Sequence, residues 1–438
     1  MPARIIGVAA FIEKSKYLVA TGGKGQFRGR RMGEKGEKRT VIRDILSIYV
    51  PAFFLNLGMS IVSPILPDYS RSFNVSYSVA TIAISIYAIG RLFADLPVGA
   101  LGDRIGRRPV MLGGIAIIMA GALLSGMAQS FWELVLYRLF QGVGSAMWQT
   151  MRQAMLQDIL KPEERGRVMG YFQSFTLIGS SAGPSIGGIL ADTWGIRAPF
   201  FGYALGCGIC FILSFFLISE SKSRTKPQEA KSHEHEGFSL PVFKRLLTNA
   251  GFTAACIATL ANALQRQGTR GTLIPFYGSG VLNLSKTEVG NALSLATLAN
   301  LFITIPTGYA LDKIGRKSIL VASLALTSVV VFLFTLTGDF TQLAITCVLL
   351  GVSQGVGGQV PLTMASDCTM NEPHGSSMGL FRMFTDIGFI VGPVLVGSLI
   401  DAAGMNVAFY SMSAVTLASM GFTLMFAHET LPGKDKRR

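Results

Sequence analysis

The sequence has 438 residues, of which half are hydrophobic and only 15% are charged, whereas soluble domains carry about 25% charged residues. Apolar runs recur along the whole chain, and a run of about 18 residues or more can cross a bilayer as a helix. Helices are the only open-ended elements that satisfy their own backbone hydrogen bonds in lipid. The composition therefore excludes a soluble protein and predicts an all-α integral membrane protein.

Twelve transmembrane helices are expected, and several contain Gly or Pro, as membrane helices tolerate. Their expected bounds in chain order are 44–66, 77–100, 109–128, 131–158, 166–190, 196–219, 248–275, 287–311, 318–337, 340–366, 376–400 and 404–427. The residues before the first helix are rich in Gly and Lys, and such a composition favours disorder.

The net charge of +14 raises the alternative of a nucleic-acid-binding protein, but the positions of the charges argue against it. Fifteen Lys and Arg lie in alternate loops between the expected helices, whereas the opposite set of loops holds only Arg71, Arg197 and Lys286. This asymmetry is the positive-inside pattern of membrane proteins. We therefore expect a multi-pass protein of the cell membrane with both termini in the cytoplasm, in contact with lipid and not with nucleic acid.

No G-x-x-x-x-G-K-[ST] motif occurs in the sequence, so no phosphate-binding loop for ATP is expected. Cys207 and Cys210 have a spacing found in redox and metal sites, but they lie inside an apolar run without a second pair or a nearby His. We interpret both as packing residues. The chain is thus expected to be neither an enzyme nor an ATP-driven pump, and to use no metal and no cofactor.

The most informative pattern is an internal repeat. A shift of 209 residues places Asp158 on Asp367, Gly166 on Gly375, Gly183-Pro184 on Gly392-Pro393, Asp192 on Asp401, and Ile105-Gly106-Arg107 on Ile314-Gly315-Arg316. The period is too long for a solenoid, so it indicates duplication of a six-helix unit. Because six spans separate equivalent positions, the copies share one orientation, and a substrate site is expected between them near the midplane.

The repeat also sets the predicted domain organisation, with a monomer as the expected state. The predicted parts are a basic, disordered cytoplasmic tail (1–43), an N-terminal six-helix bundle (44–219), a cytoplasmic linker (220–247), a C-terminal six-helix bundle (248–430) and a basic tail (431–438).

Two expected cytoplasmic loops, Gly99–Arg108 and Gly308–Lys317, carry copies of one motif, and they resemble the motif between helices 2 and 3 of the major facilitator superfamily. The resemblance covers residues 44–430 and implies the major facilitator fold. In that family these residues hold the halves together, with the Asp near a helix N-terminus, where the helix dipole favours a carboxylate. The gating residues implied are Gly99, Asp103, Arg104, Gly106, Arg107, Arg108, Gly308, Asp312, Gly315 and Arg316.

Three further motifs resemble the same family. The run Arg138-Leu-Phe-Gln141-Gly142-Val-Gly144 resembles its helix 4 motif, whose Arg is linked to proton coupling, and the second half has Gly351 or its neighbours in place of this Arg. Leu57-Gly58 with Pro64-Ile-Leu-Pro67 resembles the helix 1 motif of the twelve-helix drug:proton antiporters. A third, helix-packing motif resembles helix 5 of the antiporters and comprises Gly179, Gly183, Pro184, Gly187 and Gly188, with Gly392 and Pro393 in the second half.

Charged residues inside the expected helices are expensive in lipid and are functional by default. Arg91 and Asp95 are four residues apart, as are Arg382 and Asp386, so each pair is expected to interact along its own helix. Asp95 and Asp386 are the candidate proton carriers, together with Arg138 in coupling, although ion pairing would instead make each Asp a structural residue.

Polar side chains without an acidic neighbour mark the expected substrate cavity. Arg266 and Arg270 lie on one face of a helix near Asn262, and paired guanidinium groups suit a carboxylate or a phosphate. The same charges can instead serve helix packing. Asn56 and Gln141 complete the set of cavity candidates.

The sequence thus predicts a secondary active transporter that moves a small molecule by alternating access. Proton-coupled efflux of amphipathic, drug-like compounds is the first hypothesis, with protons or another ion as the coupling partner. Proton-coupled uptake of an organic anion is the second. A hypothesis of another class is a transporter-like receptor or scaffold that moves no solute.

Overall fold

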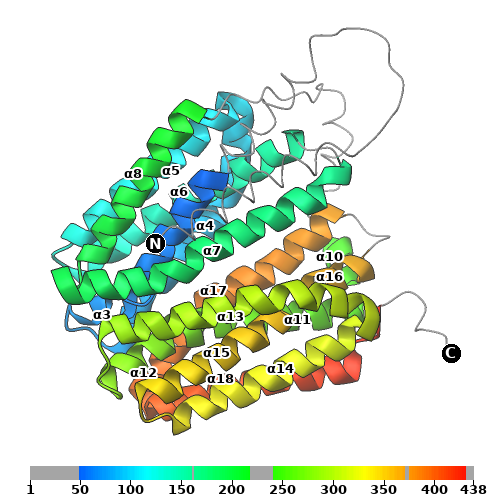
Figure 1. Ribbon diagram of the computed structural model, residues 1–438. Helices are drawn as coiled ribbons and strands as arrows, with labels where there is room; N and C mark the ends of the chain where they lie inside the picture. Colours follow the sequence, from blue (N-terminus) through cyan, green and yellow to red (C-terminus); the bar gives the residue numbers. More distant parts are fainter. Residues whose placement is uncertain (1–48, 160–161, 218–239, 370–373, 431–438) are drawn as a thin grey trace, which may run out of the picture. The chain divides into compact units, whose positions relative to one another are not determined.

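The computed structural model describes residues 49–159, 162–217, 240–369 and 374–430. These residues form helices and, within the described ranges, no strand (Figure 1). The predicted N-terminal tail, most of the predicted linker and the predicted C-terminal tail lie outside them. The helices of the first half are Tyr49–Val62, α3 (Leu66–Arg71), α4 (Tyr77–Ile105), α5 (Arg107–Met127), α6 (Phe131–Ile159), α7 (Pro162–Trp194) and α8 (Ala198–Leu217).

The second half begins with the short amphipathic helix α10 (Leu240–Thr248) and repeats the pattern of the first. Its helices are α11 (Ala250–Leu264), a π-helical segment (Gln265–Leu273), α12 (Ile274–Gly280), α13 (Lys286–Ile314), α14 (Arg316–Leu333), a short 3-10 turn (Phe334–Leu336), α15 (Phe340–Gly357), α16 (Val360–Cys368), α17 (His374–Ala403) and α18 (Met405–Phe426).

The described part of each expected span is helical, but not every span is one uninterrupted helix. Within the described ranges, seven helices are long and apolar enough on their own to cross a membrane. The first span breaks before α3 at Pro64, and the seventh contains the π-helical segment. Other spans are more polar, such as α6 with Arg138 and Arg152. The interruptions follow from Pro, which removes a backbone donor, and from an extra residue in the helix, which makes a π-bulge.

The duplication extends to the backbone geometry. Six described residues have a positive φ, and they form three pairs exactly one repeat apart in number: Asn74 and Asn283, Gly106 and Gly315, and Gly195 and Gly404. Gly106 (φ 105°, ψ 153°) and Gly315 (φ 111°, ψ 153°) form nearly identical turns. Only Gly adopts such angles without strain.

Side-chain contacts repeat as well. A side-chain nitrogen of Arg108 donates to the Phe215 carbonyl at 2.7 Å, and Nζ of Lys317 donates to the equivalent Leu424 carbonyl at 2.9 Å. The repeat predicted from the sequence is thus found in turns and in contacts.

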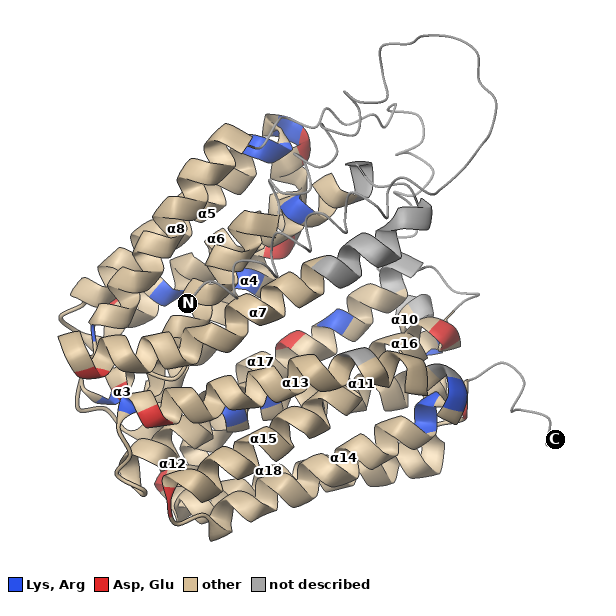
Figure 2. Cartoon of the chain, in the orientation of Figure 1, with Lys and Arg blue, Asp and Glu red and all other residues tan. Residues whose placement is uncertain are grey.

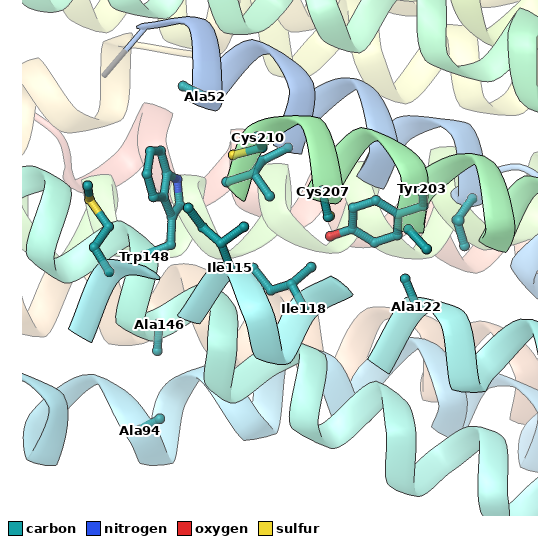
Figure 3. Packing of buried hydrophobic residues seen from close by; sticks show 14 of the residues in the cluster. Ala52, Ala94, Ile115, Ile118, Ala122, Ala146, Trp148, Tyr203, Cys207 and Cys210 are labelled. Atoms are coloured by element: carbon teal, nitrogen blue, oxygen red, sulfur yellow. The ribbon is translucent and has the colours of Figure 1, made fainter. Parts of the chain in front are cut away.

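The core of the first half is built from small and apolar side chains of its helices, and Figure 3 shows part of it. Cys207 and Cys210 on α8 point into this core beside Ile115 and Ile118 of α5, and both thiols are buried. Their surroundings agree with the packing role predicted for them.

Two helix pairs join the halves: α4 packs against α17, and α7 packs against α13 (Figure 1). Within each half, glycines allow equally close approach. A Cβ on Gly142 would lie less than 3.0 Å from the Tyr87 carbonyl, and a Cβ on Gly351 would lie as close to the Ala296 carbonyl, one repeat further on. Lipid offers no hydrophobic drive for helix association, so this close packing holds the bundle together.

Gly142→Ala is therefore expected to destabilise the protein by about 1–3 kcal/mol, the usual cost of overpacking. Gly421 on α18 is the matched control, because a Cβ there meets nothing within 4 Å. Gly421→Ala is expected to be neutral or stabilising by about 0.4–1 kcal/mol. Thermal unfolding of both purified variants checks this, and equal melting temperatures would contradict it.

Candidate functional site

A cavity of ≈ 350 Å³ lies between the two halves. Asn56 and Arg138 of the first half line it, together with Asn262, Arg266 and Arg270 of the second. The lining contains three arginines and no Asp or Glu. The structure thus brings four of the five predicted cavity residues together with Arg138, whereas Gln141 is fully buried beside them.

Arg138 is buried in the middle of the first half and has partners on three sides. Its Nε donates to the Ala83 carbonyl at 3.3 Å, Nη1 donates to Oε1 of Gln141 at 2.8 Å, and its guanidinium lies 4.8 Å from the centre of the Tyr87 ring. Gln141 in turn donates to the Ser125 hydroxyl. The equivalent position in the second half is Cys347, because Gly142 and Gly351 are equivalent.

Arg270 lies in the π-helical segment that interrupts the seventh span. Its Nη2 donates to the Leu293 carbonyl at 3.1 Å and to the Thr297 hydroxyl, and its Nη1 contacts Oε1 of Gln354 at 3.4 Å. These contacts fix the guanidinium against α13 and α15. The amide nitrogen of Gln354 is buried and has no hydrogen-bond partner among the residues that the structure describes.

Arg266 lies one turn earlier and differs from Arg270. Its side chain is exposed to the cavity, and its guanidinium makes no hydrogen bond or ion pair with any residue of the described ranges. Arg91 and Arg270 both lie near enough to act on it electrostatically. Arg266 is thus an available cation in a site that is already positive.

Two ion pairs connect α4 with α17 across the halves. Arg91 pairs with Asp386, and Arg382 pairs with Asp95 at 3.0 Å. The expected pairing within each helix is a minor feature, since Nε of Arg382 lies 4.0 Å from Asp386. The partners cross because α4 and α17 face each other at this depth, which sequence spacing cannot show. Arg138, predicted to act with these acids in coupling, makes its contacts elsewhere.

The same two helix pairs are closed at the end of the bundle that carries the N-termini of α4 and α13. Asp401 at the end of α17 accepts hydrogen bonds from the backbone nitrogens of Tyr77 (3.0 Å) and Ser78 (2.7 Å) on α4. One repeat away, Asp192 of α7 accepts from the backbone nitrogens of Lys286 (3.2 Å) and Thr287 (2.7 Å) on α13. We call these two contacts the reciprocal caps.

Other contacts reinforce this closed end. Lys286 pairs with Asp68, and the Ser279 hydroxyl donates to the same carboxylate at 2.9 Å. A Cβ on Gly188 would lie less than 3.0 Å from the Lys286 carbonyl, and the equivalent Gly397 would place one 2.7 Å from the Tyr77 carbonyl. The helices therefore touch backbone to backbone at both joints.

The environment of the reciprocal caps lowers the pKa of both aspartates. Partial burial alone would raise the pKa of Asp192, but hydrogen bonds from Thr287 and Lys286 outweigh it. Partial burial alone would likewise raise the pKa of Asp401, but hydrogen bonds from Ser78 and Tyr77 outweigh this effect and lower it. Donors that favour the charged form lower the pKa of a carboxyl group.

The predicted gating motifs lie at the opposite end, around Gly106 and Gly315. Asp103 and Arg104 are exposed, and Asp103 has no hydrogen-bonded or ionic partner among the described residues. A Cβ on Gly99 or Gly308 would meet nothing within 4 Å. Figure 2 shows basic residues gathered at this end. The side chain of Asp312 lies outside the described set.

Residues of the second gating motif make ionic and hydrogen-bonding contacts with other parts of the second half. Arg316 pairs with Asp367, and its backbone nitrogen donates to Glu429 at 2.7 Å. Arg107 has a contact of its own, and Arg108 holds the Phe215 carbonyl.

The predicted helix-packing motif brings α7 against the first helix. A Cβ on Gly179, Gly183 or Gly187 would lie less than 3.0 Å from an atom of Phe53, Ser60 or Ile61 respectively. Pro184 and Pro393 lie inside α7 and α17. A Cβ on Gly392 would lie 3.1 Å from the backbone nitrogen of Gly268 in the π-helical segment.

The family model of the Major Facilitator Superfamily matches residues 48–281 and 255–438 of the chain. The chain belongs to the major facilitator superfamily. Its two six-helix bundles, duplicated by a shift of 209 residues, are the superfamily's fold, and the protein is a membrane-embedded transporter of that superfamily.

Several relatives match this chain over most of its length. Multidrug resistance protein 2 of Bacillus subtilis is 25% identical over 393 residues, covering 89% of this chain and 96% of the relative. Multidrug resistance protein MdtG of Salmonella arizonae is 27% identical over 414 residues, covering 90% and 96%. An uncharacterised transporter of the superfamily from Methanocaldococcus jannaschii is 24% identical over 376 residues, covering 85% and 95%.

Solved structures show the same fold. A bacterial homologue of the human lysosomal transporter Spinster, inward-facing and unoccupied, has a TM-score of 0.69 at 15% identity, with 90% of this chain and 96% of that one covered. A peptide transporter in complex with sulfate has a TM-score of 0.70 at 14% identity, with 87% and 94% covered.

Proposed function

We propose that this superfamily member is a secondary active transporter that exports amphipathic small molecules in exchange for protons by alternating access. The observation that carries the proposal is a polar cavity between two duplicated halves, joined at one end by the reciprocal caps and at mid-depth by crossed ion pairs.

Alternating access requires that the joints between the halves can open at one end while the other closes. Both joints at the capped end combine polar contacts between helix ends with close backbone packing, and we propose that both separate when this end opens. At the other end, Asp103 is available to bind a helix N-terminus when that end closes. We propose that the capped end faces outside and the basic end faces the cytoplasm, in line with the positive-inside pattern.

Asp95 is the better candidate for the proton carrier. Its side chain is 20% exposed and its partner Arg382 is 45% exposed, so water can reach the pair, whereas Asp386 is only 3% exposed. A proton on Asp95 would cancel its attraction to Arg382 and so loosen the joint between α4 and α17. Proton binding would thereby be linked to the conformation of the halves.

Export of amphipathic compounds is supported by relatives of nearly full length that are named for multidrug resistance. The arginines of the cavity favour a second candidate, uptake of an organic anion with protons. Both share the same machinery and differ in the direction of flux.

Flux in proteoliposomes under an imposed pH gradient tests the proposal. The wild-type protein is expected to move amphipathic solutes in the direction opposite to the proton flow. This gradient-driven flux is expected to disappear when a protonophore collapses the pH gradient. Asp95→Asn is expected to lose the response to the gradient while still exchanging solute downhill, because it can neither bind nor release the proton.

Thr150, which donates to Asp95 at 3.2 Å, offers a control. Thr150→Val removes a hydrogen bond but no charge, so the response to the gradient is expected to remain. Solute moving in the same direction as protons would favour uptake. Absence of any flux would favour a receptor or scaffold, and gradient-driven flux in Asp95→Asn would refute its role.

A further inference from the structure

We propose that the cavity holds an anionic group of the transported molecule, a carboxylate, sulfonate or phosphate, between the guanidinium of Arg266 and the side-chain amide of Gln354, with Arg270 behind it. The proposal rests on the proposed transport function and names its substrate class. It sets this protein apart from an exporter of cationic compounds.

The first observation is an excess of positive charge in the membrane-embedded region. Leaving out the three residues at each end, the expected spans contain six arginines (Arg91, Arg138, Arg152, Arg266, Arg270 and Arg382) and only two acidic residues, Asp95 and Asp386. Both aspartates are held by Arg91 and Arg382 on the joint between α4 and α17. No carboxylate lines the cavity itself. Uncompensated cations at this depth are costly, and an anionic ligand supplies the missing charge.

The hydrogen-bond inventory points the same way. Arg266 presents donors to the cavity without an acceptor among the described residues, and Nε2 of Gln354 is a buried donor without a partner. The orientation of the Gln354 amide follows from its Oε1, which faces Arg270. Such donors call for a ligand rich in acceptors, and carboxylates and phosphates match the fork of a guanidinium.

The backbone shows how the two arginines come to differ. The π-helical segment Gln265–Leu273 changes the angular spacing of its side chains, and π-bulges occur often at functional sites. Gln265 anchors the segment, because its amide nitrogen donates to the Met412 carbonyl (2.7 Å) and to the Thr416 hydroxyl (2.6 Å) of α18. Arg270 then reaches α13, while Arg266 stays in the cavity. One arginine is held in place and the other is free to bind.

The rest of the cavity lining suits the apolar part of an amphipathic anion. Met59, Ile84, Leu177 and Phe389 face the same cavity. The structure therefore accommodates an amphipathic anion, with the charge on the second half and the apolar part toward the first.

Binding of a matched ligand series to the purified full-length protein in nanodiscs tests the proposal. The probes are octanoate, octanesulfonate and octyl phosphate, with octanamide as the neutral analogue and octylammonium as the cationic one. The three anions are expected to raise the melting temperature and to bind about tenfold or more tightly than octanamide, and octylammonium is expected to bind least, because like charges repel.

Two substitutions test whether Arg266 binds the anionic group. Arg266→Gln is expected to weaken anion binding about tenfold or more while leaving octanamide binding unchanged. Arg266→Lys keeps the charge but loses the two-pronged geometry, so an intermediate affinity is expected. Arg245→Gln, which removes an exposed arginine on α10, is the matched control and is expected to bind all probes as the wild type does. Because the Arg266 guanidinium has no hydrogen-bonded or ionic partner among the described residues, its variants are expected to fold.

Anions that bind no better than octanamide, or equally well to Arg266→Gln, would overturn the proposal. Flux of the same probes in proteoliposomes separates this result from a failure of the proposed function. Arg266-dependent binding without any flux would keep the anion site and refute transport, whereas proton-driven flux without preference for anions would keep transport and refute the site.

Discussion

Asp386→Asn is expected to destabilise the protein by about 3 kcal/mol, at the lower end of the range for breaking a buried ion pair. The Asp386 side chain is 3% exposed and that of Arg91 is 14% exposed, so the change leaves a cation without its counter-charge inside the bundle. Transport is expected to be lost with it. Thermal unfolding of the purified variant and flux in proteoliposomes measure the two effects.

The second crossed pair provides the control for this result. Asp95→Asn breaks an ion pair between the same two helices, but its partners are 20% and 45% exposed, and solvent-exposed ion pairs contribute only about 0–1 kcal/mol. A smaller loss of stability is therefore expected. Replacing Arg91 by Gln in the Asp386→Asn background is expected to recover part of the loss, since it removes the unpaired cation. Equal losses for the two Asp variants, or no recovery, would contradict this account.

Replacing both Asp192 and Asp401 by Asn is expected to shift the protein toward a state open at the capped end. Asn removes the negative charge and one of the two acceptor oxygens from each cap, and a carboxylate at a helix N-terminus contributes up to about 1 kcal/mol through its charge. The loss at two caps then amounts to about 2 kcal/mol, or about a 30-fold change in the ratio of the two states. A cysteine introduced at Ser180, which lines the cavity, reports the change. Its labelling by a membrane-impermeant thiol reagent added outside cells is expected to accelerate.

Asp339→Asn is the matched control for the caps. Asp339 accepts from the backbone nitrogen of Gln342 at 2.8 Å, so it caps α15 within one half. Its loss is expected to cost similar stability without changing the labelling rate. Faster labelling in Asp339→Asn, or an unchanged rate in the double variant, would count against a gating role for the reciprocal caps.

The pH dependence of the caps follows from the pKa values of the two aspartates, which lie below the ordinary value of 3.8. A carboxyl group whose pKa is lowered in the folded state stabilises that state fully above its unfolded pKa, and the contribution is lost as the pH falls through the lowered value. The caps therefore stay ionised between about pH 5 and 8. A pH response of transport in that range is expected to persist in the Asp192→Asn, Asp401→Asn protein.

The helices and their duplication could be predicted from the sequence because both depend on local properties. Apolar runs specify membrane helices, and the shift that aligns Gly106 with Gly315 aligns their backbone angles as well. The π-helical segment was not predicted, although the sequence showed that this stretch is polar and contains the paired arginines Arg266 and Arg270. Such a segment depends on contacts with other helices, as the bonds of Gln265 to α18 show.

The candidate site was only partly predictable for a similar reason. The sequence singled out Arg266, Arg270, Asp95 and Asp386, but the partners of the acids depend on which helices face each other. Spacing of four residues favours pairing along one helix, whereas the structure pairs each Asp with the Arg of the opposite half. The reciprocal caps were missed, yet a signal was available, because Asp192 and Asp401 align in the repeat at the ends of two expected spans.

Some features of the bundle recur in both copies and others occur in only one. Turn glycines, helix-capping residues and close helix contacts recur one repeat apart. The ionic residues of the spans do not, since Arg138 corresponds to Cys347, Arg266 to Leu57 and Asp95 to Thr304. The contacts that join and shape the halves are therefore present in both copies, whereas each residue that we propose for substrate binding or proton coupling occurs in one copy only. An engineer who wishes to retune selectivity without impairing the motion should vary the positions at which the two copies disagree.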